Sequence, residues 1–227
     1  MLAAAKAALV NIGPMGRTVP DIRRVILLHG IWMAGVTMRP LARRLRAQGF
    51  EPEVLGYRSV AAAPQAAIER LLGCIDAGGP AHVVGHSLGG LIALHALDAR
   101  PQAEVGRVLC LGSPLCGSGA AAGLAKLPLS ALYFGRSGDI LLGGCTRWPG
   151  RFEVGVIAGT RPRGMGQWFG RFQGEHDGTV SVDETRAPGL VDHLVLPVSH
   201  VGMVLSEEVA RQAGRFLATG RFRRDAR

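Results

Sequence analysis

The segment Gly85-His86-Ser87-Leu88-Gly89-Gly90 contains a serine whose neighbours suit nucleophilic chemistry. It lies between a short apolar run at 81–84 and a helical pattern at 88–99. A small-x-Ser-x-Gly turn between a strand and a helix holds the serine hydroxyl on a strained corner that a substrate carbonyl can reach. Glycine is needed on both sides because a side chain there would collide with the neighbouring strand or helix. The motif alone is weak evidence, so the prediction depends on the strand before it and the helix after it.

A serine hydroxyl attacks an ester at neutral pH only with a nearby base, and the base needs an acid that orients it. We expect His200 to be the base, because it follows the last predicted strand and precedes the final helix. We expect Asp177 to be the acid, because it follows the fifth predicted strand and Gly178 allows a tight turn there. Asp-Gly is also a common turn. The alternatives for the acid are therefore kept as Asp183, Glu175 and Asp139, with Asp192 disfavoured because it begins a strand.

The other histidines are weaker candidates for the base. They lie in or beside predicted strands and helices, or next to the candidate acid: His82, His86, His95, His176 and His193. Of these, His82 and His86 flank the predicted nucleophile strand, whose backbone aims them elsewhere. His29 is expected to be a structural residue of the turn after the first strand.

Attack on an ester puts negative charge on the former carbonyl oxygen, and each preorganised N–H donor there contributes about 3 kcal/mol. The backbone N–H of Leu88 is one expected donor, because it lies at a helix N-terminus, where the dipole favours an anion. The second donor should come from the loop after the first strand. We expect the backbone N–H of Ile31, with Trp32 as the alternative.

Short apolar runs alternate with helical patterns along the chain. The predicted strands are 25–29, 52–55, 81–84, 105–111, 152–158 and 192–196, and the predicted helices are 37–48, 65–75, 88–99 and 206–217. Thr37 is a candidate N-cap for the first helix, and Gly49 is a candidate stop. This alternation predicts a parallel sheet covered on both faces, with ligands bound beyond the carboxyl ends of the strands. The residues selected above each follow a predicted strand, as that rule requires.

One long segment separates the fourth and fifth predicted strands. It supports two interpretations of equal weight: a small cap over the site at 114–150, or an ordinary helical crossover that covers the sheet. Under both interpretations we expect one domain over residues 1–227. Cys116 and Cys145 lie in this segment and could pair.

Composition excludes several classes of protein. Of 227 residues, 48% are hydrophobic and 19% charged, which is typical of a soluble globular protein. No apolar run is long enough for a spanning helix, so stable membrane insertion is not expected. The net charge is +9, but the arginines are scattered and aromatic residues make up only 5%, so nucleic-acid binding is not expected. The Ala-rich start is interrupted by Lys6 and lacks a clear cleavage site, which favours a cytoplasmic location over a secreted or membrane-peripheral one.

Several of these motifs together resemble a known family. The order Ser, Asp, His, with His29-Gly30 after the first strand and the serine motif after the third, resembles the α/β-hydrolase superfamily. Within it, 27–32, the serine motif and Gly112-Ser113-Pro114 are similar to bacterial lipases and esterases and to the lipase-like inositol deacylases. The resemblance covers 24–217 and implies a reduced α/β-hydrolase fold, with about six mostly parallel strands, helices on both faces and a small cap insertion.

The same resemblance implies hydrolysis of carboxylic esters through an acyl-serine, with no cofactor and no metal. Only about 24 residues precede the first strand, so the usual antiparallel N-terminal strands are expected to be missing or shortened. A small sheet with a short cap implies an open site for a small-molecule or lipid ester. Thioester or amide cleavage, acyl transfer, and a non-catalytic binding protein on the same fold are the alternatives.

Apolar residues near the expected rim of the site could line an acyl pocket. The candidates for substrate binding are Trp32, Met33, Leu115 and Trp168, with Trp148 and Phe169 as weaker ones. Core packing is the alternative role for each of them.

Overall fold

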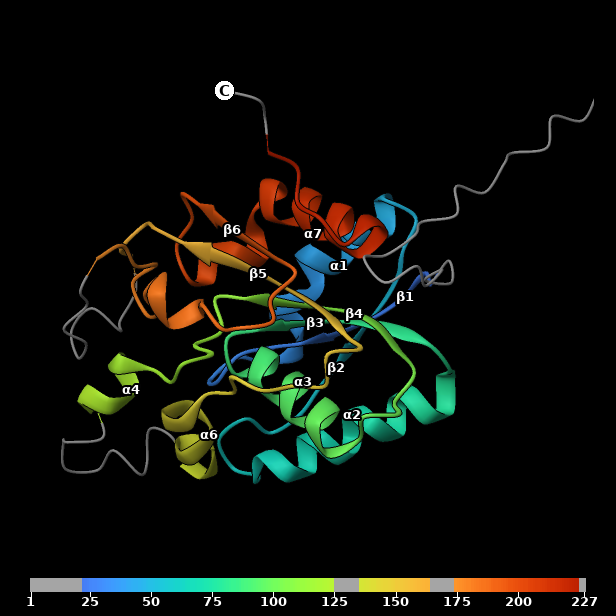
Figure 1. Ribbon diagram of the computed structural model, residues 1–227, viewed down its shortest axis with the longest axis horizontal. Helices are drawn as coiled ribbons and strands as arrows, with labels where there is room; N and C mark the ends of the chain where they lie inside the picture. Colours follow the sequence, from blue (N-terminus) through green and yellow to red (C-terminus); the bar gives the residue numbers. More distant parts are fainter. Residues whose placement is uncertain (1–21, 125–134, 164–173, 225–227) are drawn as a thin grey trace, which may run out of the picture.

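Six strands form one sheet in the computed structural model, which describes residues 22–124, 135–163 and 174–224. The strands are β1 (Arg24–Leu28), β2 (Glu51–Leu55), β3 (Ala81–His86), β4 (Val105–Leu111), β5 (Glu153–Gly159) and β6 (Asp192–Leu196). Their order is β2-β1-β3-β4-β5-β6, and every neighbouring pair is parallel (Figure 1). The predicted parallel sheet is confirmed, with no antiparallel strand in it among the described residues.

Helices cover both faces of this sheet. One face carries α2 (Pro64–Gly78) and α3 (Leu88–Ala99), and the other carries α1 (Arg39–Ala47) and α7 (Glu207–Thr219) (Figure 1). The four central strands, β1, β3, β4 and β5, are buried on both faces, so successive residues enter different cores. In β1, Ile26 and Leu28 pack toward α2 and α3, and Val25 and Leu27 pack toward α1 and α7. This explains why the central strands have mostly continuous apolar runs instead of an alternating pattern.

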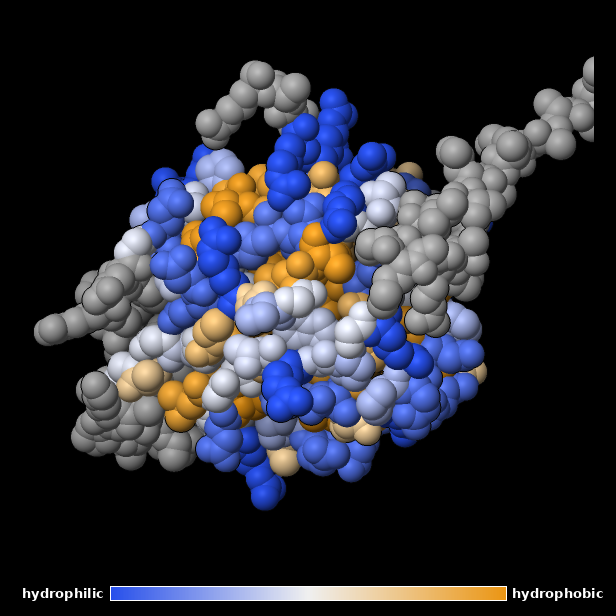
Figure 2. Space-filling model, in the orientation of Figure 1, coloured by the Kyte–Doolittle hydropathy of each residue, from blue (hydrophilic) through white to orange (hydrophobic). Residues whose placement is uncertain are grey.

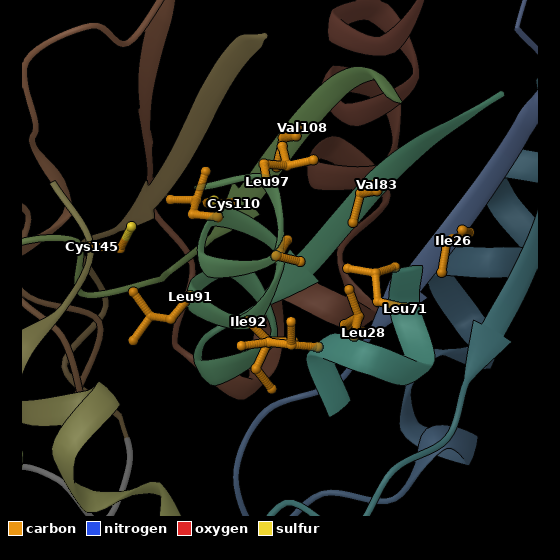
Figure 3. Packing of buried hydrophobic residues seen from close by; sticks show 14 of the residues in the cluster. Ile26, Leu28, Leu71, Val83, Leu91, Ile92, Leu97, Val108, Cys110 and Cys145 are labelled. Atoms are coloured by element: carbon orange, nitrogen blue, oxygen red, sulfur yellow. The ribbon is translucent and has the colours of Figure 1, made fainter. Parts of the chain in front are cut away.

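The core on the α2 and α3 side is closed by helix residues at helical spacing. In α2 the buried side chains are Ala67, Ile68, Leu71, Leu72 and Ile75. Figure 3 shows Leu71 of α2 and Leu91, Ile92 and Leu97 of α3 beside Ile26, Leu28, Val83, Val108 and Cys110 of the strands. On the outer surface, hydrophilic side chains are spread over the face in Figure 2, with apolar ones between them.

Two helix starts follow different rules. The predicted cap at Thr37 is wrong: a 3-10 turn, η1 (Gly35–Met38), precedes α1, and the Thr37 hydroxyl donates to the Ala34 carbonyl at 2.7 Å. Pro40 lies in the first turn of α1, where its missing N–H costs nothing. At α7 the Ser206 side chain does cap the helix by accepting from the backbone N–H of Val209 at 3.3 Å.

The segment between β4 and β5 contains α4 (Gly119–Leu124), a 3-10 turn η2 (Gly135–Ser137) and α6 (Gly138–Gly143); residues 125–134 lie outside the described part. The segment contacts α3 through His95, whose Nε2 bonds to the Gly144 carbonyl at 3.0 Å. It contacts the loop after β2 through Ser137, whose hydroxyl donates to the Ser59 carbonyl at 2.8 Å. These contacts fit a crossover, and a cap over the site remains a prediction.

The suggested pairing of Cys116 with Cys145 is wrong, because both thiols are free. The Cys116 thiol donates to the Arg186 carbonyl at 2.8 Å, and the Cys145 thiol donates to the Arg147 carbonyl at 3.2 Å. Of the helices in the described residues, none combines the length and apolarity that crossing a bilayer requires.

Candidate active site

Ser87 forms the corner between β3 and α3. Its φ of 53° and ψ of −119° lie in a sparsely populated region that costs about 1–3 kcal/mol. Only Ser87 and Trp32 have positive φ among the non-glycine residues that the structure describes. Ser87 occupies the N-cap position of α3, yet its side chain makes no capping hydrogen bond. The hydroxyl is therefore not used to stabilise the helix.

The glycines around Ser87 are required by close backbone approach. A Cβ on Gly85 would lie 2.3 Å from the Gly90 nitrogen, and one on Gly89 would lie 2.6 Å from the Leu28 carbonyl oxygen. A Cβ on Gly90 would lie 2.1 Å from Ser113 Oγ. Any of these side chains would push β3, α3 or a neighbouring strand apart, which is the collision expected from the sequence.

Asp177 and His200 lie in the loops after β5 and β6, and their side chains are hydrogen-bonded. His200 Nδ1 donates to Asp177 Oδ2 at 2.7 Å, and the backbone N–H of His200 donates to the Asp177 carbonyl at 3.0 Å. The second carboxylate oxygen, Oδ1, accepts from the backbone N–H groups of Thr179 at 2.8 Å and Val180 at 2.7 Å. With both oxygens occupied, the carboxylate is fixed, and His200 Nε2 is left to face another group.

Two opposing effects set the pKa of Asp177. Burial alone would raise it, since only 1% of the residue is exposed. The His200 ring, its hydrogen bond and the two backbone N–H groups favour the carboxylate and together hold the pKa below its usual value. Asp177 is therefore ionised at neutral pH and orients the imidazole through a charge-assisted bond.

Ser87 and the Asp177–His200 pair lie at the same edge of the sheet. The Ser87 N–H donates to the Leu111 carbonyl at 2.8 Å, at the end of β4. The next residue, Gly112, has a φ of 57°, and a Cβ on it would lie 3.1 Å from both Asp177 Oδ2 and His200 Nδ1. Ser87 is 5% and His200 7% exposed, so both are largely enclosed. Three positions far apart in sequence thus gather where β3, β4, β5 and β6 end.

His86 contacts this group, so the expectation that the strand backbone aims it elsewhere is wrong. β3 continues through His86, two residues beyond the predicted end, and its Nε2 donates to the His200 carbonyl at 2.9 Å. The two rings lie 4.7 Å apart. Burial, with His200 nearby, lowers the pKa of His86 to about 3. Its position directly before Ser87 was the one available signal.

The loop after β1 lies against the serine corner. A Cβ on Gly30 would lie 3.2 Å from Ser87 Cβ and 3.1 Å from His86 Nδ1. The next residues are the half-buried Ile31 and then Trp32, which has a φ of 57°. Leu88 is the first residue of α3. The loop and the helix N-terminus that carry the two expected N–H donors are therefore neighbours.

The buried residue His29 begins this loop, and its ring stacks on that of Tyr57 with centroids 4.3 Å apart. His29 Nδ1 donates to the Gly30 carbonyl at 2.8 Å, and the Tyr57 hydroxyl donates to the His29 carbonyl. Burial lowers the pKa of His29 and raises that of Tyr57, so both stay neutral. Sequence reasoning did not identify Tyr57, because nothing in its local pattern marks a contact with a residue 28 positions away.

The expected rim residues have different environments. Trp32 is 57% exposed, and Met33 is half-buried against the core of α1 and α7. The expectation for Leu115 is wrong: it has no exposed surface, belongs to the core against α3, and accepts a bond from the Cys145 N–H at 2.8 Å. Trp168 and Phe169 lie outside the described residues, and Trp148 packs at the edge of the core.

The alternative acids make no hydrogen bond to His200, whose Nδ1 is bonded to Asp177. Asp183 has an 84% exposed side chain that pairs with Arg186 at 3.6 Å, and Glu175 and Asp139 are also exposed. His193, another weaker candidate for the base, bonds to the Thr185 hydroxyl at 2.8 Å. In the described ranges, no three His, Cys, Asp or Glu side chains are grouped so that they could hold a metal ion.

Solved structures of other proteins share the fold of this chain. The mature lipase BlEst2 of Bacillus licheniformis superposes with a TM-score of 0.72 at 18% identity, covering 88% of this chain and 92% of that one. A metagenomic carboxyl esterase, MGS0156, gives a TM-score of 0.63 at 17% identity, covering 95% of this chain and 83% of that one. Such low identities establish a shared fold.

Sequence comparison gives the family. Lipase LipV of Mycobacterium tuberculosis is 38% identical over 93 residues, which span 38% of this chain and 36% of that protein. This chain therefore aligns with little more than a third of that relative. The model of the alpha/beta hydrolase family matches residues 25–221, almost the whole described part of the chain. The resemblance inferred from the motifs is confirmed, and the chain belongs to the alpha/beta hydrolase family.

Proposed function

We propose that the protein is a serine hydrolase that cleaves carboxylic esters through an acyl-serine intermediate. The observation that carries the proposal is the hydrogen-bonded Asp177–His200 pair, which lies at the strand ends beside the strained corner of Ser87. Strain of this kind is kept where function requires it. The names of the similar proteins, a lipase and a carboxyl esterase, support the same chemistry.

In the first half of the reaction, Ser87 Oγ attacks the ester carbonyl and its proton passes to His200 Nε2. Because Nδ1 donates to Asp177, the lone pair of the neutral ring is on Nε2, as a general base requires. The imidazolium that forms is stabilised by the Asp177 carboxylate. It then gives the proton to the departing alcohol, and the C–O bond to the alcohol breaks as the acyl-serine forms.

The backbone N–H groups of Leu88 and Ile31 would stabilise the oxyanion. Leu88 is the first residue of α3, so its N–H has no partner within the helix and points along the positive end of the dipole. The loop that carries Ile31 lies against Ser87, as the 3.2 Å approach of Gly30 indicates. In the second half of the reaction, His200 takes a proton from water, hydroxide attacks the acyl carbon, and the acid leaves as Ser87 Oγ is reprotonated.

The substrate would be an ester with an apolar acyl group of modest size, free or in a lipid. Exposed apolar side chains occur on both loops that flank the site: Trp32 and Val36 after β1, and Val201 and Leu205 directly after His200. Residues of this kind, exposed on functional loops, offer a surface to an apolar ligand.

A fluorophosphonate probe tests the nucleophile, because the attacking oxygen displaces fluoride from phosphorus and stays bonded to it. We expect one adduct, mapped to Ser87 by peptide mass spectrometry, and none in Ser87→Ala. Ser113→Ala is the matched control, since Ser113 is fully buried at the end of the adjacent strand and should not affect labelling. Absence of an adduct at Ser87 would favour a non-catalytic binding protein.

A series of p-nitrophenyl esters of increasing acyl length then tests the substrate class. We expect turnover of short and medium chains, lost in Ser87→Ala. Parallel assays with a thioester and an anilide of the same acyl group separate ester hydrolysis from the alternative leaving groups. Faster cleavage of the thioester or the anilide would replace the ester assignment and leave the nucleophile unchanged.

A further inference from the structure

The bond between His86 and the His200 carbonyl connects the residue before the nucleophile to the residue proposed as the base. We propose that His86 is a positioning residue, which holds the His200 loop at a fixed distance from Ser87. The inference rests on the proposed function, because it assigns His86 a role in the reaction of Ser87 and His200. His86 is fully buried, so it acts through His200 and does not touch substrate.

His86 can serve as an anchor because its own position is rigid. It ends β3, a central strand, and pairs with Leu111 of β4 in the ladder. The following residue is Ser87, whose N–H is bonded to the same Leu111. A bond to the His86 ring therefore places its partner relative to the nucleophile itself.

The contacts of His200 show why this bond differs from the others. The Nδ1 and backbone N–H of His200 both bond to Asp177, and its carbonyl accepts from His86 Nε2 at 2.9 Å. That carbonyl also receives a longer contact, 3.4 Å, from the Met203 N–H within its own turn. Among the hydrogen bonds of the described residues, only the one from His86 joins His200 to the strand that leads into Ser87. Without it, His200 and Asp177 would remain paired but could shift together away from the serine.

His86 is a donor at every working pH. A carbonyl only accepts, so the proton is on Nε2, and Nδ1 is a lone pair that is buried without a hydrogen-bond partner. Gly30 packs beside that nitrogen, since a Cβ on it would lie 3.1 Å away, and no acceptor is bonded there to stabilise a second proton. The ring therefore stays neutral, which keeps both its tautomer and the bond to His200 constant.

The test compares His86→Phe, which keeps a ring of similar size and loses the donor, with His86→Gln, whose amide N–H has a similar reach. In His86→Phe we expect kcat for a p-nitrophenyl ester to fall about 10- to 100-fold, the effect of misplacing a catalytic group by about 1 Å. KM should change less than about twofold, because a fully buried residue does not contact substrate. His86→Gln should recover most of the loss in kcat.

His82→Phe is the matched control. His82 lies on the same strand, four residues earlier and so on the same face, is 2% exposed, and accepts a bond from the Arg107 N–H at 2.9 Å. It should lose stability without losing kcat. If His86→Phe keeps a kcat within about twofold of His82→Phe, the positioning role is overturned. If His86→Phe does not fold, His86→Asn replaces it, since that amide is too short to reach the carbonyl.

A crystal structure of His86→Phe separates this inference from the proposed function. We expect the His200 imidazole to move by about 0.5 Å or more relative to Ser87, the tolerance within which catalytic groups must be held. An imidazole that stays in place overturns the positioning role, whatever the activity. If the wild-type protein neither hydrolyses esters nor reacts with the probe, the proposed function fails, and the crystal comparison alone decides whether His86 positions His200.

Discussion

Asp177 and His200 are joined twice: by the 2.7 Å bond between their side chains and by the 3.0 Å bond from the His200 N–H to the Asp177 carbonyl. The first bond sets the tautomer and orientation of the imidazole. The second connects the loop after β6 to the loop after β5. Asp177 therefore holds both the imidazole ring and the backbone of His200. A substitution of the Asp177 side chain can therefore change the tautomer of His200 while the backbone bond keeps the position of its loop.

Asp177→Asn changes the tautomer while keeping the fold. The oxygen of the new amide would stay with the N–H groups of Thr179 and Val180, so its NH₂ would face His200 Nδ1. Nδ1 must then accept, the proton moves to Nε2, and the ring can no longer take the serine proton. We expect kcat to fall by about four orders of magnitude, as in other Ser-His-Asp enzymes.

Asp183→Asn is the control for this variant, because Asp183 is an exposed acid in the same region. It should keep wild-type turnover in the same p-nitrophenyl assay. A loss below tenfold in Asp177→Asn would contradict the assigned role and return Asp183 and Glu175 as candidates for the acid.

Gly112→Ala tests how closely β4 approaches the pair. Its φ of 57° already strains any other residue by about 1–2 kcal/mol. The added Cβ would also lie 3.1 Å from Asp177 Oδ2 and His200 Nδ1, so it should displace their bond and lower both stability and kcat. Gly174→Ala has a φ of 80° and nothing within 4 Å, so it should lose stability alone. Denaturant unfolding measures the stability of each variant, and ester kinetics measure its kcat. An equal kcat in the two variants would contradict the close approach of Gly112 to Asp177 and His200.

The fold could be predicted because apolar runs and helical spacing are local signals. Each expected strand is present to within two residues, and the alternation of strands with helices correctly predicted the parallel sheet. Helix starts were harder to predict: Thr37 is a good N-cap residue, but the chain makes a 3-10 turn there, and α1 begins at Arg39 with Pro40 in its first turn. Whether a polar residue caps a helix depends on the direction of the preceding backbone, which composition does not contain.

The site could be predicted only where topology alone determines position. Ser87, Asp177 and His200 follow strands of one parallel sheet, whose carboxyl ends meet at one edge. Their catalytic roles remain predictions. The environments of His86 and Leu115 were predicted wrongly, because the first depends on where β3 ends and the second on how a loop packs against α3. Both are matters of tertiary contact between segments distant in sequence.

Buried neutral histidines should make the protein sensitive to acid. Burial lowers the pKa of His82 and His86 to about 3 and that of His193 to about 4, with nearby Arg107, His200 and Arg186 adding to the effect. In the unfolded chain these side chains take up protons near pH 6.5, so the unfolded state binds more protons between about pH 6.5 and 3. Their contribution to stability is therefore complete above pH 6.5 and is lost as the pH falls.

The expected loss is about 1.4 kcal/mol per pH unit for each of the fully buried pair, His82 and His86. Urea unfolding at a series of pH values from 8 to 4 measures it. In His82→Gln the free energy of unfolding should depend less steeply on pH, by the amount that corresponds to about one fewer proton taken up on unfolding. A free energy of unfolding that stays constant between pH 6.5 and 4 would contradict the neutral, buried state of these rings.

Tyr57→Phe tests whether the hydrogen bond from Tyr57 to His29 holds the loop after β1 in position. The change keeps the ring that stacks on His29 and removes the hydroxyl that donates to the His29 carbonyl, two residues before Ile31. We expect a loss of about 1 kcal/mol in the free energy of unfolding, typical of one hydrogen bond. We also expect a several-fold drop in kcat at unchanged KM, because an N–H that stabilises the oxyanion acts only in the transition state. Ser137→Ala is the control, because it removes a similar buried bond from a hydroxyl to the Ser59 carbonyl. It should lower stability while kcat stays at the wild-type value. An equal kcat in the two variants would show that the Tyr57 hydroxyl does not help to position the loop that carries Ile31.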